Sequence, residues 1–278
     1  MAKKKSELVV KSNRLIEASY RLSMIEQQVV LLAISRARDQ QEGLFADLPV
    51  TIRVDEFVEN YAPNSDATNV YRQLKEAMAT LFERHVVLHD IDPATQLPRV
   101  TKTRWISQAS YVDGAGHIQF IFAPAVIPFI TRLGESGEFT RYKIEKIGQM
   151  TSVYAVRLYE LLFQYASIGK RDLSVAWLRE AFQLENEYKI LADLKKRVID
   201  VAVAQINEFS DIDVSYKQVK TGRTVTGFDF KIKLKDSEKP KKKATIDKEF
   251  VRKNARTGES WDEAYRRLLE ERGQQRLA

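Results

Sequence analysis

The feature that most constrains the fold of this chain is a pattern of expected helices and strands that occurs twice. Each half of the sequence runs through a helix, a short strand, a short helix, a longer helix and a two-stranded hairpin. A shift of 121 places residues 52–57 on residues 173–178, and a shift of 120 places Leu74-Lys75 on Leu194-Lys195. Helices followed by such a hairpin form the winged variant of the helix-turn-helix. The sequence therefore predicts an α+β fold of two tandem winged-helix domains.

Capping residues and apolar periodicity locate the elements of the first half. Ser23 precedes Glu26 by three residues, the spacing of a capping box, and begins a helix through the apolar run 29–34. Asp66 begins the longer helix, which runs to about Arg84. The other expected elements are a strand over 50–54, a helix from Asp55 to Tyr61, a strand over 86–88, and strands over 105–110 and 117–122 around an Asp113–Gly116 turn.

The second half follows a stretch that is typical of a linker, with Pro124, Pro128, Gly134 and Gly137, continuing to Gly148. Its expected elements are a helix over 152–167, a strand at 173–174, a short helix capped by Ser174, a long helix over 188–208, and strands over 212–219 and 225–234. We expect an N-terminal winged-helix domain over 8–132, a C-terminal one over 139–235, and a basic linker with a tail helix over 236–278.

The composition excludes several kinds of site. The chain has no cysteine, so disulfides, thiolate zinc sites, iron–sulfur clusters and cysteine nucleophiles are absent. No stretch approaches the roughly 18 uncharged apolar residues of a membrane span, and the N-terminus lacks the apolar core of a signal peptide. We therefore expect a cytoplasmic protein without membrane association.

The formal charge of +7 is concentrated at the ends of the chain. Residues 1–5 contain three lysines, and residues 235–256 contain nine Lys or Arg against four acidic residues. Basic tails favour polyanionic partners. Because positive and negative charges balance in the rest of the chain, a prediction of DNA binding has to rest on where the individual Lys and Arg residues of that part lie.

The expected helix over 188–208 has the division of faces that a DNA-reading helix needs. One face is apolar, while Lys189, Lys196 and Arg197 lie on the other and Lys195 lies at its border. The hairpin tip that follows places Lys220 and Arg223 around a glycine turn, which suits phosphate contacts. The alternative is an ordinary amphipathic helix with a solvated face.

The corresponding helix of the first half carries fewer free cations. Arg72 and Lys75 lie on its polar face with Thr68, but Glu76 and Glu83 dilute their charge. This helix is expected to position phosphates, and a solvated face remains the alternative.

The sequence lacks the motifs that several classes of enzyme would need. His85 and His89 have the i, i+4 spacing of a metal pair, but no third ligand accompanies them. A phosphate-binding glycine loop and a serine nucleophile elbow are absent from the sequence. The sequence predicts a protein that is not an enzyme, with no catalytic residue, metal or cofactor.

The tail contains a second capping box, Ser260 and Glu263, before a short amphipathic helix. Its apolar face consists of Trp261, Ala264, Tyr265, Leu268 and Leu269. This face can dock on the body of the protein or on a partner protein, and both remain open.

Three segments resemble the iteron-binding initiator family of theta-replicating plasmids: residues 12–23, residues 157–162 and the run from Tyr188 to Asn207. The resemblance covers roughly residues 8–234. It implies that the second winged helix reads the major groove of a directly repeated origin element, while the first holds the adjacent groove. It also implies monomers that start replication and dimers, paired through the first domain, that repress the gene's own promoter.

Further implications of the resemblance concern partners and residues. The family's partners are double-stranded DNA (origin repeats and operator), the host initiator ATPase and the replicative helicase. Its base-reading face falls by position on Lys189, Lys195, Lys196 and Arg197. The family favours arginine here, and lysine binds guanine bidentately less well, so the individual base contacts differ.

The function expected is therefore a plasmid replication initiator. The alternative is a tandem winged-helix repressor without a replication role, and a third hypothesis is a nicking enzyme or primase that depends on His85 or Asp213. A vector that carries only this gene and its flanking DNA separates the first two, because a repressor gives no transformants.

Overall fold

The structure, a computed structural model, describes residues 8–40, 45, 47–92, 94–131, 138–235, 251–252, 254–256, 259–260, 263–265 and 267–268. Residues 1–235 form one compact unit and residues 236–278 a second. The expected lysine-rich linker, Trp261 and Leu269 lie outside the described residues.

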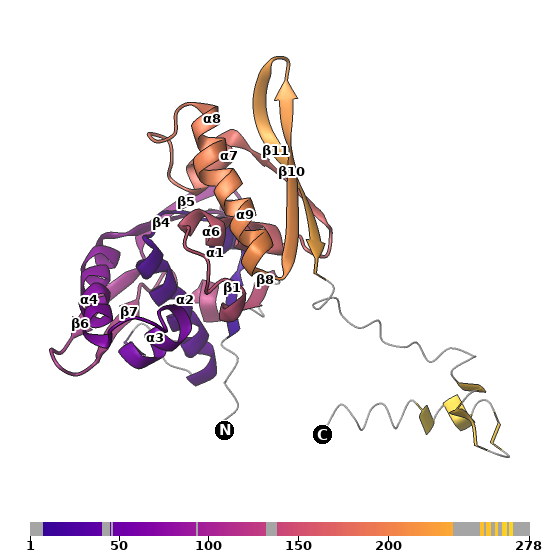
Figure 1. The fold of residues 1–278 in the computed structure, drawn as a ribbon, viewed down its shortest axis with the longest axis horizontal. Helices are drawn as coiled ribbons and strands as arrows, with labels where there is room; N and C mark the ends of the chain where they lie inside the picture. The colour runs from indigo at the N-terminus through magenta and orange to yellow at the C-terminus, as the bar shows by residue number, and fades with distance from the viewer. Residues whose placement is uncertain are drawn as a thin grey trace. The chain divides into compact units, whose positions relative to one another are not determined.

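The first half contains a complete winged helix (Figure 1). Its helices and strands are α2 (Met24–Gln40), β3 (Val50–Arg53), α3 (Val54–Tyr61), α4 (Ala67–Glu83), β6 (Ile106–Tyr111) and β7 (His117–Phe122). The strands form an antiparallel sheet in the order β3-β7-β6. The strand that follows the first helix thus pairs with the last strand of the hairpin.

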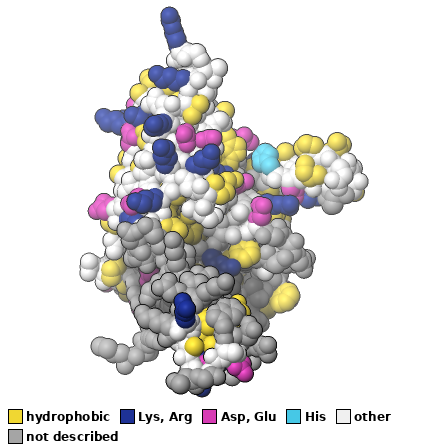
Figure 2. Space-filling view, turned by 90° about the vertical axis from the view of Figure 1, so that its right-hand side faces the viewer, with side chains coloured by type: hydrophobic (Ala, Val, Ile, Leu, Met, Phe, Trp, Pro, Cys, Tyr) yellow, Lys and Arg dark blue, Asp and Glu magenta, His cyan; other side chains and the backbone are white. Residues whose placement is uncertain are grey.

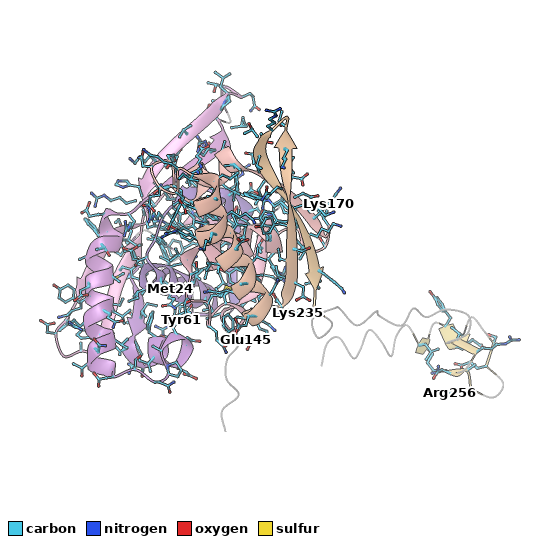
Figure 3. All side chains as sticks on the ribbon, turned by 45° about the horizontal axis from the view of Figure 1, so that its top comes forward. Met24, Tyr61, Glu145, Lys170, Lys235 and Arg256 are labelled. Carbon is cyan, nitrogen blue, oxygen red and sulfur yellow. The ribbon has the colours of Figure 1, made fainter. Side chains whose placement is uncertain are left out.

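The second half repeats this topology. Its elements are α6 (Val153–Phe163), β9 (Lys170–Ser174), α7 (Val175–Ala181), α8 (Leu191–Leu194), the π-helical turn η2 (Lys195–Ile199), α9 (Asp200–Phe209), β10 (Ile212–Thr221) and β11 (Thr224–Leu234). The sheet order is β10-β11-β9. After β11, the Lys235 Nζ donates to the Asn207 carbonyl (2.6 Å) and ties the end of this half to α9 (Figure 3). The prediction of two tandem winged helices is confirmed.

Local capping explains why three of the helices begin where the sequence predicts. Ser23 and Glu26 form the reciprocal pair, with the Glu26 N–H donating to the Ser23 Oγ (3.3 Å). Asp66 accepts from the Asn69 N–H (2.9 Å), and Ser174 accepts from the Trp177 N–H (3.1 Å). Asp55 is not a cap, because α3 begins one residue earlier and Arg53 occupies the N-cap position.

Several elements were not predicted from the sequence, some of them because their partners lie far away in the chain. The stretch from residue 139 to 148, expected to be a linker, instead contains β8 (Phe139–Lys143) and the 3-10 turn η1 (Ile144–Lys146). β8 pairs along its whole length with β1 (Leu8–Ser12). The other elements that were not predicted are α1 (Asn13–Glu17), β2 (Ser19–Tyr20), β5 (Pro98–Arg104) and α5 (Pro128–Thr131). The strand expected over 86–88 is present as the longer β4 (His85–Ile91), and a separate sheet has the order β2-β4-β5.

The two halves share one continuous hydrophobic core. The largest fully buried aromatic side chains come from both halves: Trp105, Phe120, Phe122, Tyr159, Phe228 and Phe230. Tyr20 packs edge-on against Trp105, with ring centroids 4.8 Å apart. The hydrophobic effect therefore stabilises residues 8–235 as one compact body in which the two winged helices share a core.

A buried ion pair lies at the junction of the halves. The Lys11 Nζ of β1 contacts the Glu160 Oε1 of α6 at 2.7 Å, and both side chains are almost completely buried (1% and 0% exposed). Glu160 also accepts from the Tyr142 hydroxyl (2.5 Å). Burial is the largest single effect and lowers the pKa of Lys11, but the charge and hydrogen bond of Glu160, together with Tyr20, outweigh it and raise that pKa above its ordinary value. Lys11 is therefore charged inside the protein.

Arg157 of α6 reinforces the same junction. Its guanidinium donates to the carbonyls of Ile16 (2.9 Å) and Ala18 (2.8 Å) and lies 3.5 Å from the centroid of the Tyr20 ring. Arg171, at the start of β9, also donates to the Leu161 carbonyl and to Glu17 Oε1. The N-terminal segment is thus bound to the first helix of the second half by buried charges.

Lys11→Met is expected to destabilise the protein by about 3–5 kcal/mol, because it leaves the Glu160 carboxylate buried without its cation. Lys143→Met is the matched control on the paired strand, since Lys143 is half-exposed and contacts Glu145 only at 3.6 Å. The control should cost less than about 1 kcal/mol. Urea unfolding followed by circular dichroism measures both, and equal costs for the two variants would contradict the role of the buried pair.

Candidate nucleic-acid interface

The helix of the second half that is expected to read DNA, called the recognition helix below, consists of α8, η2 and α9 (residues 191–209) and begins three residues later than expected. Tyr188 has a positive φ of 47°, which no helix interior tolerates, so this residue lies in the irregular turn over residues 182–190 that precedes the helix. Lys189 is exposed in this turn and does not lie on the helix face, which corrects the expectation. Sequence periodicity could not show this, because the turn is held by a side chain from the preceding helix.

That side chain is Arg179 of α7, which the sequence analysis did not single out. Its guanidinium donates to the backbone carbonyls of Leu184 (3.3 Å), Glu187 (2.8 Å), Tyr188 (2.6 Å) and Lys189 (3.3 Å). A planar guanidinium with several N–H donors fixes the shape of such a turn. Arg179 thereby sets where the recognition helix starts.

The cations of the recognition helix lie in its π-helical turn. The Asp200 N–H donates to the Lys195 carbonyl, five residues back. In such a wide turn, successive residues are separated by a smaller angle about the helix axis than in an α-helix. Lys195 is half-buried, while Lys196 and Arg197 are exposed. Arg197 lies 4.0 Å from Asp193 and remains 68% exposed. The opposite face is buried in the core through Leu194, Val198, Ile199, Ala202 and Ile206.

The wing supplies the second group of cations. Lys220 and Arg223 are exposed at the tip of the β10–β11 hairpin, where Gly222 has a φ of 63° that favours glycine. The tip and α8 lie at the same end of the second half (Figure 1). Figure 2 shows Lys and Arg side chains over this wing and up to its tip. Four of the predicted residues, Lys196, Arg197, Lys220 and Arg223, are thus presented to solvent on the recognition helix and its wing.

The recognition helix of the first half presents a smaller cationic surface. Arg72 is exposed, and its guanidinium donates to the Asn69 side chain (2.7 Å). Lys75 is half-buried: its Nζ contacts Asp113 Oδ1 at 2.6 Å and lies about 5 Å from the centroids of the Tyr71 and Tyr111 rings. The hydrogen bond to Asp113 raises the pKa of Lys75. Lys75 therefore ties α4 to the first wing, and Asp113 offsets its charge.

The residues named for metal or nicking chemistry are not assembled into a site. His85 and His89 lie on one strand, β4, and the His89 Nε2 lies 3.4 Å from Glu180. Asp213 is exposed on β10. Within the described ranges, no three His, Asp or Glu residues are grouped so as to hold a metal ion, and no helix has the length and apolar character to cross a membrane.

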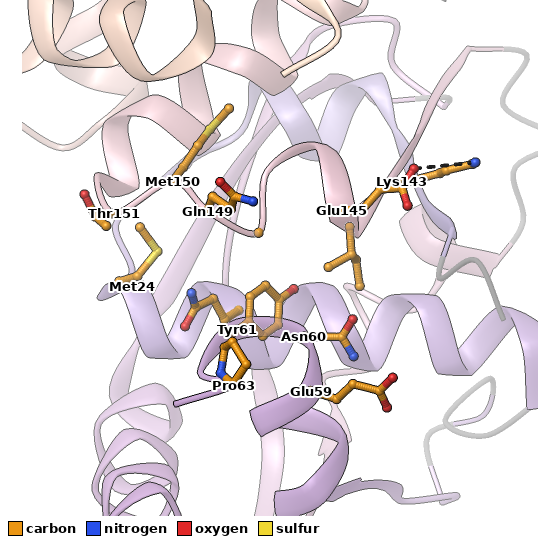
Figure 4. Close-up of a pocket in the computed structure, with 13 residues that line it drawn as sticks. Met24, Glu59, Asn60, Tyr61, Pro63, Lys143, Glu145, Gln149, Met150 and Thr151 are labelled. Carbon is orange, nitrogen blue, oxygen red and sulfur yellow. Dashed lines mark ion pairs between the residues drawn. The ribbon is translucent and has the colours of Figure 1, made fainter. Parts of the chain in front are cut away.

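A cavity of about 780 Å³ lies between the end of α3 and residues 143–151 (Figure 4). Its lining includes Tyr61, Met24 and Met150, together with the ion pair of Lys143 and Glu145. None of the eight predicted DNA-binding residues lines it. The cavity is therefore separate from the cationic surface of the recognition helix and wing.

Comparisons with known proteins agree with this architecture. Over residues 8–163 the chain matches the family model described as "Initiator Replication protein, WH1", and over residues 174–232 the model "Initiator Rep protein, WH2". The chain is 22% identical to a "Replication initiation protein" of Escherichia coli over 236 residues, which span 82% of this chain and 71% of that protein. It is 25% identical to an "Uncharacterized 27.6 kDa protein" of Escherichia coli over 224 residues, covering 77% and 91% of the two chains.

Among solved structures, the fold is similar to that of the Pi initiator protein, crystallised in complex with iteron DNA. The TM-score is 0.62 at 18% sequence identity, covering 84% of this chain and all of that one. The repeated topology and the two matched domain models, one of which spans more than half of the sequence, give a single conclusion. The chain belongs to the initiator replication protein family, with a WH1 domain followed by a WH2 domain.

Proposed function

We propose that this protein initiates replication of a plasmid by binding directly repeated origin sequences (iterons), and that its dimer represses its own promoter. Its membership of the initiator family supports the first part. The iteron DNA bound by the similarly folded Pi initiator supports the choice of ligand. Double-stranded DNA is therefore the proposed partner of the cationic surface.

The observation that carries the proposal is the pair of exposed cations in the recognition helix, Lys196 and Arg197, beside the cationic wing tip. A helix anchored by one buried face and cationic on the other can enter the major groove. Lys220 and Arg223 then reach the phosphate backbone. Lys189 and Lys195 lie at the edges of this surface, where phosphate contacts suit them better than base contacts.

We propose a division of labour between the domains. Residues 139–235 read the sequence, while residues 8–132 hold the adjacent backbone, with Arg72 as the more available cation and Lys75 as an anchor of the first wing. Because residues 8–235 share one core, the two surfaces have a fixed spacing. Two domains about one helical turn apart on one duplex predict a site of about 20 base pairs.

The proposed dimer surface is the β4–β5 hairpin of the first half. β5 is the edge strand of its sheet, and its neighbourhood exposes Ile91 (54%), Leu97 (63%) and Val100 (64%). Figure 2 shows hydrophobic side chains gathered on this projecting hairpin, at the right of the view. Exposed apolar edge strands pair readily with a second chain. A second copy of this protein is the occupant that the monomer–dimer hypothesis requires.

The proposed role is not enzymatic, since the origin would be opened by partners. The host initiator ATPase and the replicative helicase are the partners that the family resemblance implies. A cytoplasmic location follows from the proposed target, plasmid DNA.

Alanine at Lys196 or Arg197 is expected to cost about 1–3 kcal/mol of binding to the cognate duplex if the residue contacts a base. Fluorescence anisotropy at near-physiological salt measures this, comparing a duplex from the DNA that flanks the gene with a scrambled duplex. Lys231→Ala is the control, because Lys231 is exposed on β11 and its removal changes the net charge equally. The control should leave the ratio of the two affinities unchanged.

An unchanged affinity ratio in both recognition-helix variants would remove them from the base-reading surface. The same variants should also lose the ability to maintain a vector that carries only this gene and its flanking DNA. If the wild-type protein binds the cognate duplex specifically but the vector gives no transformants, the protein is instead a transcriptional repressor without a replication role.

Val100→Lys is expected to shift the protein to monomers, because a buried lysine at the pairing edge is costly. Analytical ultracentrifugation over a range of concentrations measures the dimer dissociation constant. Ile168→Lys provides the control, since Ile168 is equally exposed (62%) but lies in the second half. A dimer that withstands Val100→Lys and dissociates with Ile168→Lys would place the interface elsewhere.

A further inference from the structure

The turn before the recognition helix is held from both halves of the protein. Within the second half, Arg179 binds its carbonyls. From the first half, Arg21 makes a two-pronged ion pair with Glu187: its Nη1 contacts Oε1, and its Nη2 donates to Oε2 at 3.1 Å. Glu187 lies one residue before Tyr188, the residue with positive φ. The first half therefore contacts the turn at the point where the backbone changes direction.

Neighbouring contacts join the same two regions. The Gln183 amide donates to the Ser19 carbonyl of β2 (3.4 Å), and Glu180 lies 3.4 Å from the His89 Nε2 of β4. Tyr154 of α6 packs between Phe182, at 6.0 Å between ring centroids, and Tyr188, at 6.3 Å. Residues 180–188 thus lie against β2, β4 and α6, so the turn belongs to the junction as well as to the second winged helix.

The Arg21–Glu187 pair differs from the buried pair of Lys11 in what it can do. Its side chains are 38% and 42% exposed, so its contribution to overall stability is small. A bidentate guanidinium–carboxylate pair nevertheless fixes direction as well as distance. A contact of this kind at the start of a helix restricts local motion of the turn more than it stabilises the fold.

We propose that Arg21 is a positioning residue for DNA reading: through Glu187, the first half sets the orientation of the recognition helix of the second half. This inference rests on the proposed function and extends it, because sequence discrimination by the second domain then depends on a residue of the first. Small displacements of the recognition helix would weaken sequence discrimination, because hydrogen bonds to base edges need close alignment.

A first experiment needs no DNA. Amide hydrogen exchange of residues 184–194 in the free, full-length protein is expected to be at least about fivefold faster in Arg21→Ala than in the wild type. Arg53→Ala is the control: Arg53 pairs with Asp55 at 3.1 Å, entirely within the first half and outside the β4–β5 hairpin. Exchange of residues 184–194 should be unchanged in the control. Unchanged exchange in Arg21→Ala would overturn the proposal.

A second experiment measures discrimination. The ratio of affinities for the cognate and scrambled duplexes is expected to fall about threefold to thirtyfold in Arg21→Ala and in Glu187→Ala, with binding to the scrambled duplex little changed. The double variant Arg21→Glu with Glu187→Arg restores the pair in reverse and should recover most of the ratio. Rescue of this kind distinguishes a specific pair from a general loss of charge.

The outcomes separate the two claims. If the wild-type protein discriminates and Arg21→Ala retains the full ratio, or if Arg53→Ala loses as much, the positioning role of Arg21 is wrong while the proposed function stands. If the wild-type protein binds both duplexes equally, the proposed function fails, and the inference fails with it.

Discussion

The ion pair between Lys11 and Glu160 is the constraint on which the arrangement of the protein depends. A charged lysine and a carboxylate in a dry interior are tolerated only when each is the other's partner and nearby hydroxyls complete the carboxylate. The pair holds Lys11 of β1 next to Glu160 of α6, and β1 pairs along its whole length with β8. The N-terminal strand is thereby attached to the second half of the chain, and Arg157 binds the segment that follows it.

This attachment changes how two winged helices can act on DNA. Tandem domains on a flexible linker would sample many spacings, and each would bind nearly independently. A shared core gives the recognition helices α4 and α8–α9 one relative placement. The junction also extends to the turn at residues 182–190, so side chains of both halves contact the segment that precedes the helix of Lys196 and Arg197. The spacing and orientation of the two recognition helices are thus set by the folded protein, which suits binding to DNA with regularly repeated sequences.

The sequence predicted those parts of the fold that depend on neighbouring residues. Ser23, Asp66 and Ser174 cap helices through residues three positions away, and the hairpins are closed by short turns. β1, β5 and β8 were missed because their pairing partners are distant or because their strands do not alternate clearly. In the candidate site, the exposure of Lys196, Arg197, Lys220 and Arg223 was predictable from helical periodicity and the turn. The place of Lys189 before the helix was not predictable, because Arg179 holds the preceding turn by binding its carbonyls. The contact of Lys75 with Asp113 was not predictable either, because it depends on tertiary packing.

The central claim is that both winged helices of one rigid protein molecule contact the same duplex. Hydroxyl-radical footprinting of the full-length protein on the DNA that flanks its gene tests this claim most directly. We expect protected sugars in two groups on one face of the duplex, one helical turn apart within about 20 base pairs, repeated head to tail along the origin. Protection confined to a single turn, unaffected by changes in the first half, would show that the second winged helix binds alone and that the first does not contact the duplex.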